Sequence, residues 1–356
     1  MIARKTGPRA VAGRPRFLVI RRDNIGDLVC TTPLIAALRD RYPQAWIAAL
    51  VNRYAAPVLD NNPDLDAVFS YEKAKHLGVE ESRLTLYWQR LRLMLDLRGR
   101  AFDYAVLASP GYQASAERFA RWVGARHVIG FDNGSGLADM TVPARTPVPL
   151  HQVENTFRLL GTLGIEGPPP GLRLVPDAEA VRRSRDGLPK TAGPVVGVHV
   201  SAREADRRWP DEKFRELVGR LLRDFRATVL LTWAPGSRDD PRFPGDDESA
   251  RRLAGVFSGE LVVAMPTREL DQLIASLAAC DLVICSDGGP VHLAAALGKP
   301  VVCFFGGEQP EVWHPWGVPY RLLRTPSRNA SDIGVEETVA ACAELLPTAA
   351  GRGGDG

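Results

Sequence analysis

Short apolar runs alternate with longer stretches of helical character through the first half of the chain. Residues 17–20, 46–51 and 104–107 are almost wholly apolar, as expected of buried strands. Residues 82–97 place apolar side chains at helical spacing, and a further helix is expected over 28–41. This alternation of strand and helix predicts an α/β fold.

The same alternation restarts after a segment rich in Pro and Gly at residues 167–171, which further breakers follow at 187–194. The strands expected beyond it are 195–198, 228–231, 261–263, 282–284 and 301–305, with helices over 210–224, 267–279 and 290–298. We therefore predict two doubly wound parallel sheets, which bind ligands beyond the carboxyl ends of their strands. Two such sheets facing each other would form a cleft between domains.

Chain length agrees with this division. At about 150 residues per domain, 356 residues predict two domains. We place them at residues 1–175 and 176–346. Residues 1–15 and the tail 347–356 are polar or small, so they are expected to be disordered because they have little to bury.

Composition excludes several classes of protein. Lys plus Arg is 45 and Asp plus Glu is 42, so a net charge of 45 − 42 = +3 does not favour dedicated nucleic-acid binding. The five cysteines form no Cys-x-x-Cys pair, which fits the reducing cytoplasm. The basic N-terminus lacks the apolar stretch of a signal peptide. No apolar run reaches the roughly 18 residues of a membrane span, so we expect a soluble cytoplasmic protein, at most peripheral on a membrane.

Arginine dominates the basic residues, since six are Lys and 39 are Arg. The base composition of the coding sequence explains such a bias without any function. Anionic partners are the alternative, because a guanidinium binds phosphate through two hydrogen bonds and stays charged.

Two loops at predicted strand ends contain residues suited to chemistry. Residues 21–27 include Gly26, which permits a tight turn, and Asp27, which is either a helix cap or a general base. Residues 286–298 place successive glycines at a helix N-terminus, where exposed backbone N–H groups can bind a diphosphate. His292 in this segment is either structural or a ligand contact.

Other sequence patterns have a structural explanation. Adjacent arginines in residues 203–210 form a solvated face or neutralise phosphate. Asp64 and Asp66 form a DxD triplet, which a turn also explains, and residues 246–248 have the character of a solvated loop. The sequence shows no zinc-ligand spacing, Walker loop, GxSxG elbow or GxGxxG dinucleotide loop. It therefore predicts no metal site.

Three of these segments together resemble glycosyltransferase family 9, the lipopolysaccharide heptosyltransferases and their relatives. They are the Gly-Asp loop with Thr31-Thr32-Pro33 downstream, the Arg-Arg-Trp-Pro stretch at 207–210, and the run SDGGPVHLAAALGKPVVCFFG at 286–306. The resemblance covers residues 16–346 in order. It implies the GT-B fold, two Rossmann-like domains facing across a cleft. The N-terminal domain would then bind the acceptor and the C-terminal domain the donor, with the last helix packing back on the N-terminal domain.

The resemblance also implies an inverting, metal-independent transfer of heptose from ADP-heptose to a lipopolysaccharide core or related surface glycan, without a cofactor. Asp27 matches the family's general base, with Asn24 and Gly26 on the acceptor side. The implied donor-binding residues are Ser201, Arg207, Arg208, Met265, Asp287, Gly288, Gly289 and His292. A nucleotide-binding Glu of the family has no clear counterpart, and Asp239 and Glu248 are the candidates to replace it.

The segment 84–94 combines Trp and Arg with many leucines, a pattern of either a core-packed or a membrane-interfacial helix. For a phosphorylated glycolipid acceptor, the expected partners of the head group are Arg90, Arg92, Arg98 and Arg100. We expect a monomer that works with a nucleotide sugar and an anionic glycolipid, with the inner face of the inner membrane as its place of contact.

Two alternatives stay open. One is a GT-B transferase or epimerase that uses a UDP- or GDP-linked sugar, which nucleotide-dependent stabilisation would distinguish. The other is a two-lobed solute-binding protein, against which the missing signal peptide and odd cysteine count argue. A nicotinamide oxidoreductase is disfavoured because the first loop is not GxGxxG.

Overall fold

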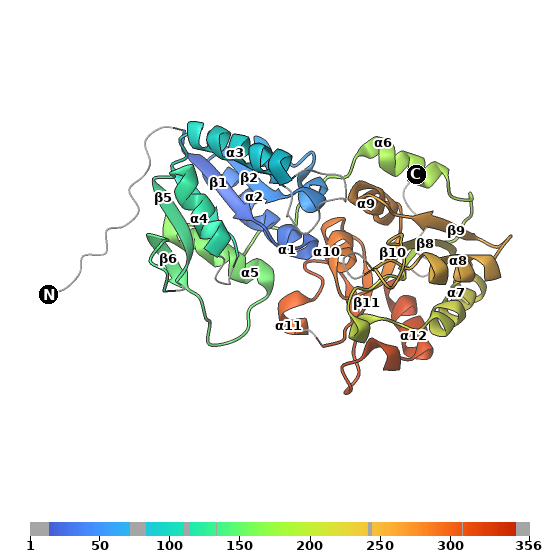
Figure 1. The fold of residues 1–356 in the computed structure, drawn as a ribbon. Coiled ribbons are helices and arrows are strands. Elements are labelled where there is room, and N and C mark those ends of the chain that lie inside the picture. Colours follow the sequence, from blue (N-terminus) through green and yellow to red (C-terminus); the bar gives the residue numbers. More distant parts are fainter. Residues whose placement is uncertain are drawn as a thin grey trace, which may run out of the picture. The chain divides into compact units, whose positions relative to one another are not determined.

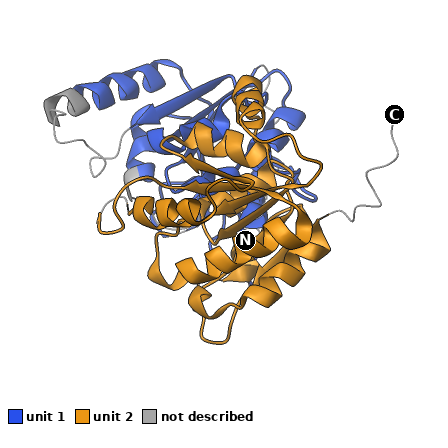
Figure 2. Cartoon of the chain, turned by 90° about the vertical axis from the view of Figure 1, so that its right-hand side faces the viewer, with its two compact units in different colours: residues 1–173 blue, residues 174–356 orange. Residues whose placement is uncertain are grey.

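Two units of similar length divide the chain, residues 1–173 and 174–356 (Figure 2). The division lies two residues before the predicted one. The computed structural model describes residues 14–71, 83–109, 114–132, 134–240, 244–307 and 309–346. Most of the two termini predicted to be disordered, up to residue 13 and from residue 347, therefore lies outside the described residues. Pro15 is buried, and its carbonyl accepts from the Trp46 N–H at 3.0 Å.

Unit 1 contains a parallel six-stranded sheet in the order β3-β2-β1-β4-β5-β6. Figure 1 labels β1, β2, β5 and β6 of this sheet. Its strands are β1 (Arg16–Arg21), β2 (Trp46–Asn52), β3 (Ala67–Tyr71), β4 (Tyr104–Leu107), β5 (His127–Asp132) and β6 (Met140–Pro143). Its helices are α1 (Ile25–Val29), α2 (Thr32–Arg41), α3 (Arg83–Gly99), α4 (Ala114–Val123) and α5 (Gln152–Phe157), with 3₁₀ turns at Arg53–Leu59 and Arg158–Leu163. Since β1 pairs with both β2 and β4, the winding changes direction between β1 and β4.

Buried apolar runs explain why the predicted strands form. In β1, every residue from Phe17 to Ile20 is at most 1% exposed, and the ring of Phe17 stacks on Tyr104 of β4 at 5.0 Å. The helix expected over 28–41 is instead two helices, α1 and α2. Pro33 explains the break, because it has no N–H to donate to the preceding turn and is favoured in the first turn of a new helix.

Unit 2 repeats the architecture, with a parallel sheet in the order β12-β11-β10-β7-β8-β9. Its strands are β7 (Val195–His199), β8 (Thr228–Trp233), β9 (Val262–Pro266), β10 (Leu282–Ser286), β11 (Val301–Phe304) and β12 (Tyr320–Leu323). Its helices are α6 (Ala178–Asp186), α7 (Asp211–Phe225), α8 (Asp247–Val256), α9 (Leu270–Ala278), α10 (Gly289–Ala296), α11 (Pro310–Trp313) and α12 (Val335–Leu345), with 3₁₀ turns η4 (Ala205–Arg207) and η5 (Ala330–Asp332). The winding changes direction between β7 and β10. Both sheets are thus doubly wound, as predicted.

The last described helix, α12, packs on α7, β11 and β12 of unit 2. Its buried Val335, Val339 and Cys342 belong to the same core cluster as Trp209 and Phe304. This helix therefore completes the core of unit 2.

All five cysteines are buried as free thiols, as expected of small apolar residues. Burial raises the pKa of Cys280 and Cys342 to about 12, so these thiols are uncharged at neutral pH. None of the helices in the described part of the chain combines the length and the hydrophobicity that a membrane span requires.

Candidate active site

Arg21 makes the contacts that hold the loop between β1 and α1. Its side chain is 1% exposed, and its guanidinium lies 3.1 Å from Asp23 and also pairs with Asp27. The same guanidinium donates to the carbonyl of Ala108, directly beyond β4. The Ser109 hydroxyl donates to Asp23 at 2.6 Å. The loops that follow β1 and β4 are therefore tied together where the winding of the sheet reverses, the usual ligand-binding position in such sheets.

Asp27 has a capping role as well as a place in this network. It is the third residue of α1, and its Oδ2 accepts the backbone N–H of Asn24 at 3.1 Å. Its side chain is 16% exposed, while Gly26 beside it is buried. A carboxylate oxygen accepts more than one hydrogen bond, so these contacts leave Asp27 able to take a proton. The two interpretations of Asp27, cap and base, are compatible.

Neighbouring side chains fix the backbone of this loop. The Asn52 amide donates to the carbonyl of Asp23 at 2.8 Å, and the Tyr54 hydroxyl lies 3.1 Å from the same oxygen. Tyr54 also donates to the Asn24 side chain at 3.2 Å. Asn24 itself is exposed. The loop is thus held in one conformation, with Asp27 and Asn24 at its accessible edge.

In unit 2, the loops after β7 and β10 meet at the corresponding point of the second sheet. The Arg207 guanidinium from the first loop lies 3.2 Å from Asp287 in the second, and the Asp287 side chain is 5% exposed. Gly288 has φ 154° and ψ −164°, a conformation open almost solely to glycine, and it precedes α10. Pro290 then occupies the first turn. The predicted arrangement of glycines at a helix N-terminus is present.

The Arg-Arg-Trp-Pro stretch has three separate roles. Trp209 is buried, stacks on Phe304 at 4.7 Å and donates to the Ile333 carbonyl at 3.0 Å. Arg207 points to Asp287, whereas Arg208 donates to the Ala202 carbonyl at 3.0 Å and so holds its own loop. Of the two arginines, Arg207 is the one placed beside the glycine loop.

A pair of glycines after β11 allows η4 to approach. The Gly307 N–H donates to Asp206 at 2.9 Å, and a Cβ on Gly306 would lie 2.6 Å from the Asp206 carbonyl oxygen. Such a separation is shorter than real Cβ contacts allow. Only glycine therefore fits there without moving the turn that presents Arg207.

The other predicted donor residues lie at different distances from this centre. Ser201 accepts the Ala234 N–H at 3.0 Å, linking the ends of β7 and β8. Met265 is half-buried in β9, three strand spacings or about 14 Å from β10 across the sheet. His292 is buried against the edge of the Trp313 ring at 5.8 Å. Burial, and then the nearby His314, lowers the pKa of His292 to about 4, so it is neutral at pH 7.

Neither candidate for the nucleotide-binding Glu occupies a buried position. Asp239 is exposed, and the Glu248 side chain is 86% exposed and pairs with Arg252 at 2.7 Å. The buried acid of this segment is Asp246, which pairs with Arg238 at 2.8 Å. Sequence reasoning missed this pair because residues 246–248 had the composition of a solvated loop.

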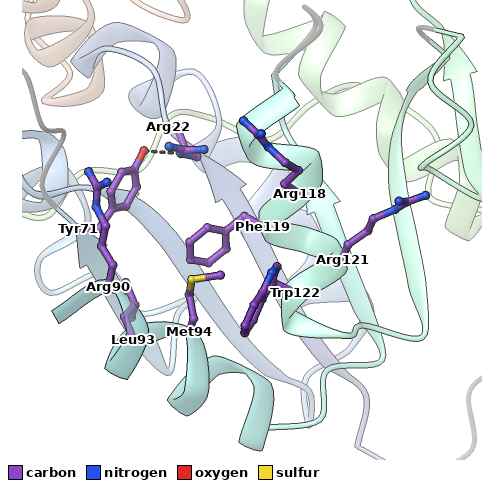
Figure 3. A pocket seen from close by; sticks show the side chains of 9 residues that line it. All are labelled: Arg22, Tyr71, Arg90, Leu93, Met94, Arg118, Phe119, Arg121 and Trp122. Carbon is purple, nitrogen blue, oxygen red and sulfur yellow. Dashed lines mark hydrogen bonds between the residues drawn. The ribbon is translucent and has the colours of Figure 1, made fainter. Parts of the chain in front are cut away.

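The four arginines expected to bind the acceptor do not gather in one place. Arg100 pairs with Asp96 at 3.1 Å, and Arg98 donates to the Trp122 carbonyl at 3.0 Å. Arg92 is exposed. Arg90 alone lines a pocket of about 420 Å³ between α3 and α4 (Figure 3).

This pocket contains residues that sequence reasoning did not single out as a group. Besides residues of α3, the pocket is lined by Arg22 and Tyr71 at the ends of β1 and β3. Helix α4 contributes Arg118, Phe119, Arg121 and Trp122. Arg22 directly follows Arg21, so the pocket adjoins the loop that presents Asp27. Their separation along the chain explains why no local motif revealed them.

The DxD triplet is structural. Asp64 is buried, and its carboxylate lies 3.2 Å from Arg173. Asp66 accepts the Ile47 N–H at 2.7 Å and pairs with Arg39 at 2.6 Å. Across the described residues, no group of three or more His, Cys, Asp or Glu side chains could hold a metal ion.

Comparisons with known proteins identify the family. The model of glycosyltransferase family 9 (heptosyltransferase) matches residues 90–342, more than half of the chain. Lipopolysaccharide heptosyltransferase 1 of Escherichia coli is 30% identical over 329 residues, which are 89% of this chain and 94% of that protein.

Solved structures agree on the fold. A family 9 glycosyltransferase from Veillonella parvula is 18% identical with a TM-score of 0.79, covering 93% of this chain and 97% of its own. An E. coli heptosyltransferase determined with ADP-2-deoxy-2-fluoro heptose is 20% identical with a TM-score of 0.73, covering 93% of this chain and all of its own. The two doubly wound sheets are those of the GT-B fold. The chain belongs to glycosyltransferase family 9, the heptosyltransferase family.

Proposed function

We propose that this glycosyltransferase moves a heptose from ADP-heptose to a lipopolysaccharide core or related surface glycan, with inversion at the anomeric carbon. Family membership supports heptose transfer, and the relative of the same fold determined with an ADP-heptose analogue supports ADP as the nucleotide.

The proposal rests above all on the loop Asp287–Gly289 beside Arg207. Backbone N–H groups at the start of α10 point where a diphosphate would lie, and the positive end of the helix dipole favours its charge. Gly288 permits close approach because it has no side chain. Arg207 is a charged donor at the same place, and it offsets the charge that grows on the departing ADP. The proposed chemistry calls on no metal or cofactor.

Asp27 is the general base in this proposal. The acceptor oxygen attacks the anomeric carbon, the bond from that carbon to the ADP phosphate oxygen breaks, and the acceptor's proton passes to the Asp27 carboxylate. Attack on the face opposite the leaving group inverts the configuration. Arg21 and the Asn24 N–H orient the carboxylate from behind, so that its exposed edge meets the acceptor.

The acceptor that we propose is an anionic glycolipid, reached at the inner face of the inner membrane. Four guanidinium groups around the α3–α4 pocket, from Arg22, Arg90, Arg118 and Arg121, favour a negatively charged partner.

Two measurements test the proposal. ADP should raise the melting temperature more than UDP or GDP does, because only the cognate nucleotide binds the folded state strongly. Incubation with ADP-heptose and a panel of lipopolysaccharide acceptors should then add the mass of one heptose to one of them. Stabilisation by UDP or GDP alone would favour the alternative nucleotide sugars, and no product from any pair would contradict transfer.

A further inference from the structure

The turn η4 connects the ends of strands that are not neighbours in the sheet of unit 2. It follows β7, which pairs with β10, and β11 lies on the other side of β10. From η4, the Arg207 guanidinium lies 3.2 Å from Asp287, directly after β10. Asp206, one residue earlier, accepts the Gly307 N–H from the segment after β11 at 2.9 Å. The loop after β7 therefore crosses the end of β10 and is fastened on the far side of that strand.

The close approach of η4 to the segment after β11 depends on two glycines. A Cβ on Gly306 would lie 2.6 Å from the Asp206 carbonyl oxygen, and a Cβ on Gly307 would lie 2.8 Å from Asp206 Oδ2. Both separations are shorter than those that real Cβ atoms make. The backbone and the carboxylate of Asp206 are therefore both packed against this segment.

The residues that follow Arg207 hold the other end of the turn. Arg208 donates to the Ala202 carbonyl at 3.0 Å, which closes the loop on itself. Trp209 is buried and donates to the Ile333 carbonyl at 3.0 Å, which anchors the loop in the core of unit 2. These contacts lie after Arg207 in the chain, and the contact of Asp206 lies before it. The backbone of Arg207 is thus fixed from both sides.

We propose that Asp206 is a positioning residue for the donor: by accepting the Gly307 N–H, it holds Arg207 where the diphosphate binds. This role rests on the proposed function, which places the diphosphate beside Arg207 and the start of α10. Asp206 acts through Arg207, because a carboxylate repels a phosphate. A turn that is already held in place does not have to be ordered when the nucleotide binds. More of the attraction between guanidinium and phosphate is then available as affinity.

The direction of the effect of Asp206→Ala separates positioning from charge. Removing a carboxylate near a bound anion lowers the electrostatic repulsion, so charge alone predicts tighter ADP binding. Positioning predicts the opposite, and we expect the Kd for ADP, measured by calorimetry on the full chain, to rise at least fivefold. Asp206→Asn retains an oxygen that accepts the Gly307 N–H, so its Kd should be no more than twice that of the parent. Glu204→Ala is the matched control, because it removes an exposed carboxylate from the same loop, and it should not weaken binding.

A double substitution tests whether Asp206 acts through Arg207. In the Arg207→Gln background, Asp206→Ala should raise the Kd for ADP less than twofold, because the group that Asp206 positions is already absent. Gly307→Ala tests the same contact from its other partner, since the added Cβ would displace the Asp206 carboxylate. It should weaken ADP binding as Asp206→Ala does, and it replaces that variant if Asp206→Ala does not fold.

Three results would overturn the positioning role. They are an unchanged or lower Kd for Asp206→Ala, an equal loss of affinity in Glu204→Ala, and a loss of the same size in the Arg207→Gln background. The parent chain is titrated first with ADP, UDP and GDP, and the variants are then titrated with the nucleotide that binds most tightly. A parent that binds none of the three would contradict the proposed function and the role of Asp206 together. A parent that binds one of them, with Asp206→Ala unaffected, would contradict the role of Asp206 alone.

Discussion

The two loops at the reversal points of the two sheets have the same topology but opposite chemistry. In unit 1, buried Arg21 faces two carboxylates, Asp23 and Asp27, so this cluster carries one net negative charge. In unit 2, Arg207 and Asp287 balance each other, and the N-terminus of α10 adds positive potential. A carboxylate held by a buried cation suits proton abstraction, while a glycine loop with a cation suits a diphosphate. One architecture thus places the proposed base and the proposed anion site on different residues at equivalent positions.

The largest effect on stability is expected where the charge is most deeply buried. Arg21→Met removes the partner of Asp23 and Asp27 and leaves two carboxylates without their cation. Loss of one partner from a buried ion pair costs about 3–5 kcal/mol in the free energy of unfolding. Urea unfolding would measure it, and Arg98→Gln on the surface of unit 1 is the control. A loss below 1 kcal/mol would show that the network does not stabilise this loop.

A smaller effect on the free energy of unfolding is expected in unit 2, where backbone conformation matters more than charge. Gly288→Ala places a side chain at φ 154°, at a cost of about 1–3 kcal/mol, and should also weaken ADP binding. Space is not the obstacle, since the nearest atom to the added Cβ is Pro290 Cδ at 3.8 Å. Gly255→Ala in α8, where the added Cβ meets nothing within 4 Å, should be neutral or stabilising. Equal effects of the two substitutions on ADP binding would contradict the role of Gly288.

Acid should destabilise the protein through two buried histidines of unit 2. Burial lowers the pKa of His199 and His292 from 6.5 to about 4. The unfolded chain therefore binds more protons between pH 6.5 and 4, so this stability is complete above pH 6.5 and is lost as the pH falls towards 4. Each histidine contributes a slope of up to about 1.4 kcal/mol per pH unit in that window. His292→Leu should lessen the slope in urea unfolding from pH 4.5 to 6, and an unchanged slope would show that His292 titrates normally.

The smallest effect on the free energy of unfolding is expected at Glu248. Its substitution tests whether this side chain is only a surface charge or also binds the nucleotide. Its pair with Arg252 is exposed, so Glu248→Ala should change the free energy of unfolding by less than about 0.5 kcal/mol. ADP affinity, measured by calorimetry, should stay within twofold of the parent. A tenfold loss of ADP affinity would instead make Glu248 the missing nucleotide-binding acid.

The fold was largely predictable because strands buried on both faces of a parallel sheet are continuous apolar runs. The runs at residues 17–20 and 301–305 both form strands, β1 and β11. β12 was missed because it is an edge strand of alternating partial exposure, and Arg321 interrupts its apolar pattern. The position of α12 could not follow from its sequence, since an apolar helical face does not specify which sheet it covers.

The candidate site was predictable only where one short segment contains its residues. Asp27 and Gly288 lie in loops whose composition is informative by itself. The α3–α4 pocket is assembled from β1, β3, α3 and α4, so only the strand order brings Arg22 and Arg118 to one place. With 39 arginines in the chain, no count could single these out.

The most direct test of the roles proposed for the two loops is a pair of substitutions, each measured by kcat and by the Kd for ADP. Asp27→Asn should lower kcat by roughly 10²–10⁴-fold, the usual contribution of a general base, and leave the Kd for ADP within twofold. Arg207→Gln should raise the Kd for ADP by about tenfold or more, because a charge-assisted hydrogen bond is lost. Asp27→Asn retaining more than a tenth of the parent kcat, or weakening ADP binding as much as Arg207→Gln does, would contradict the assignment of base and anion site to the two loops.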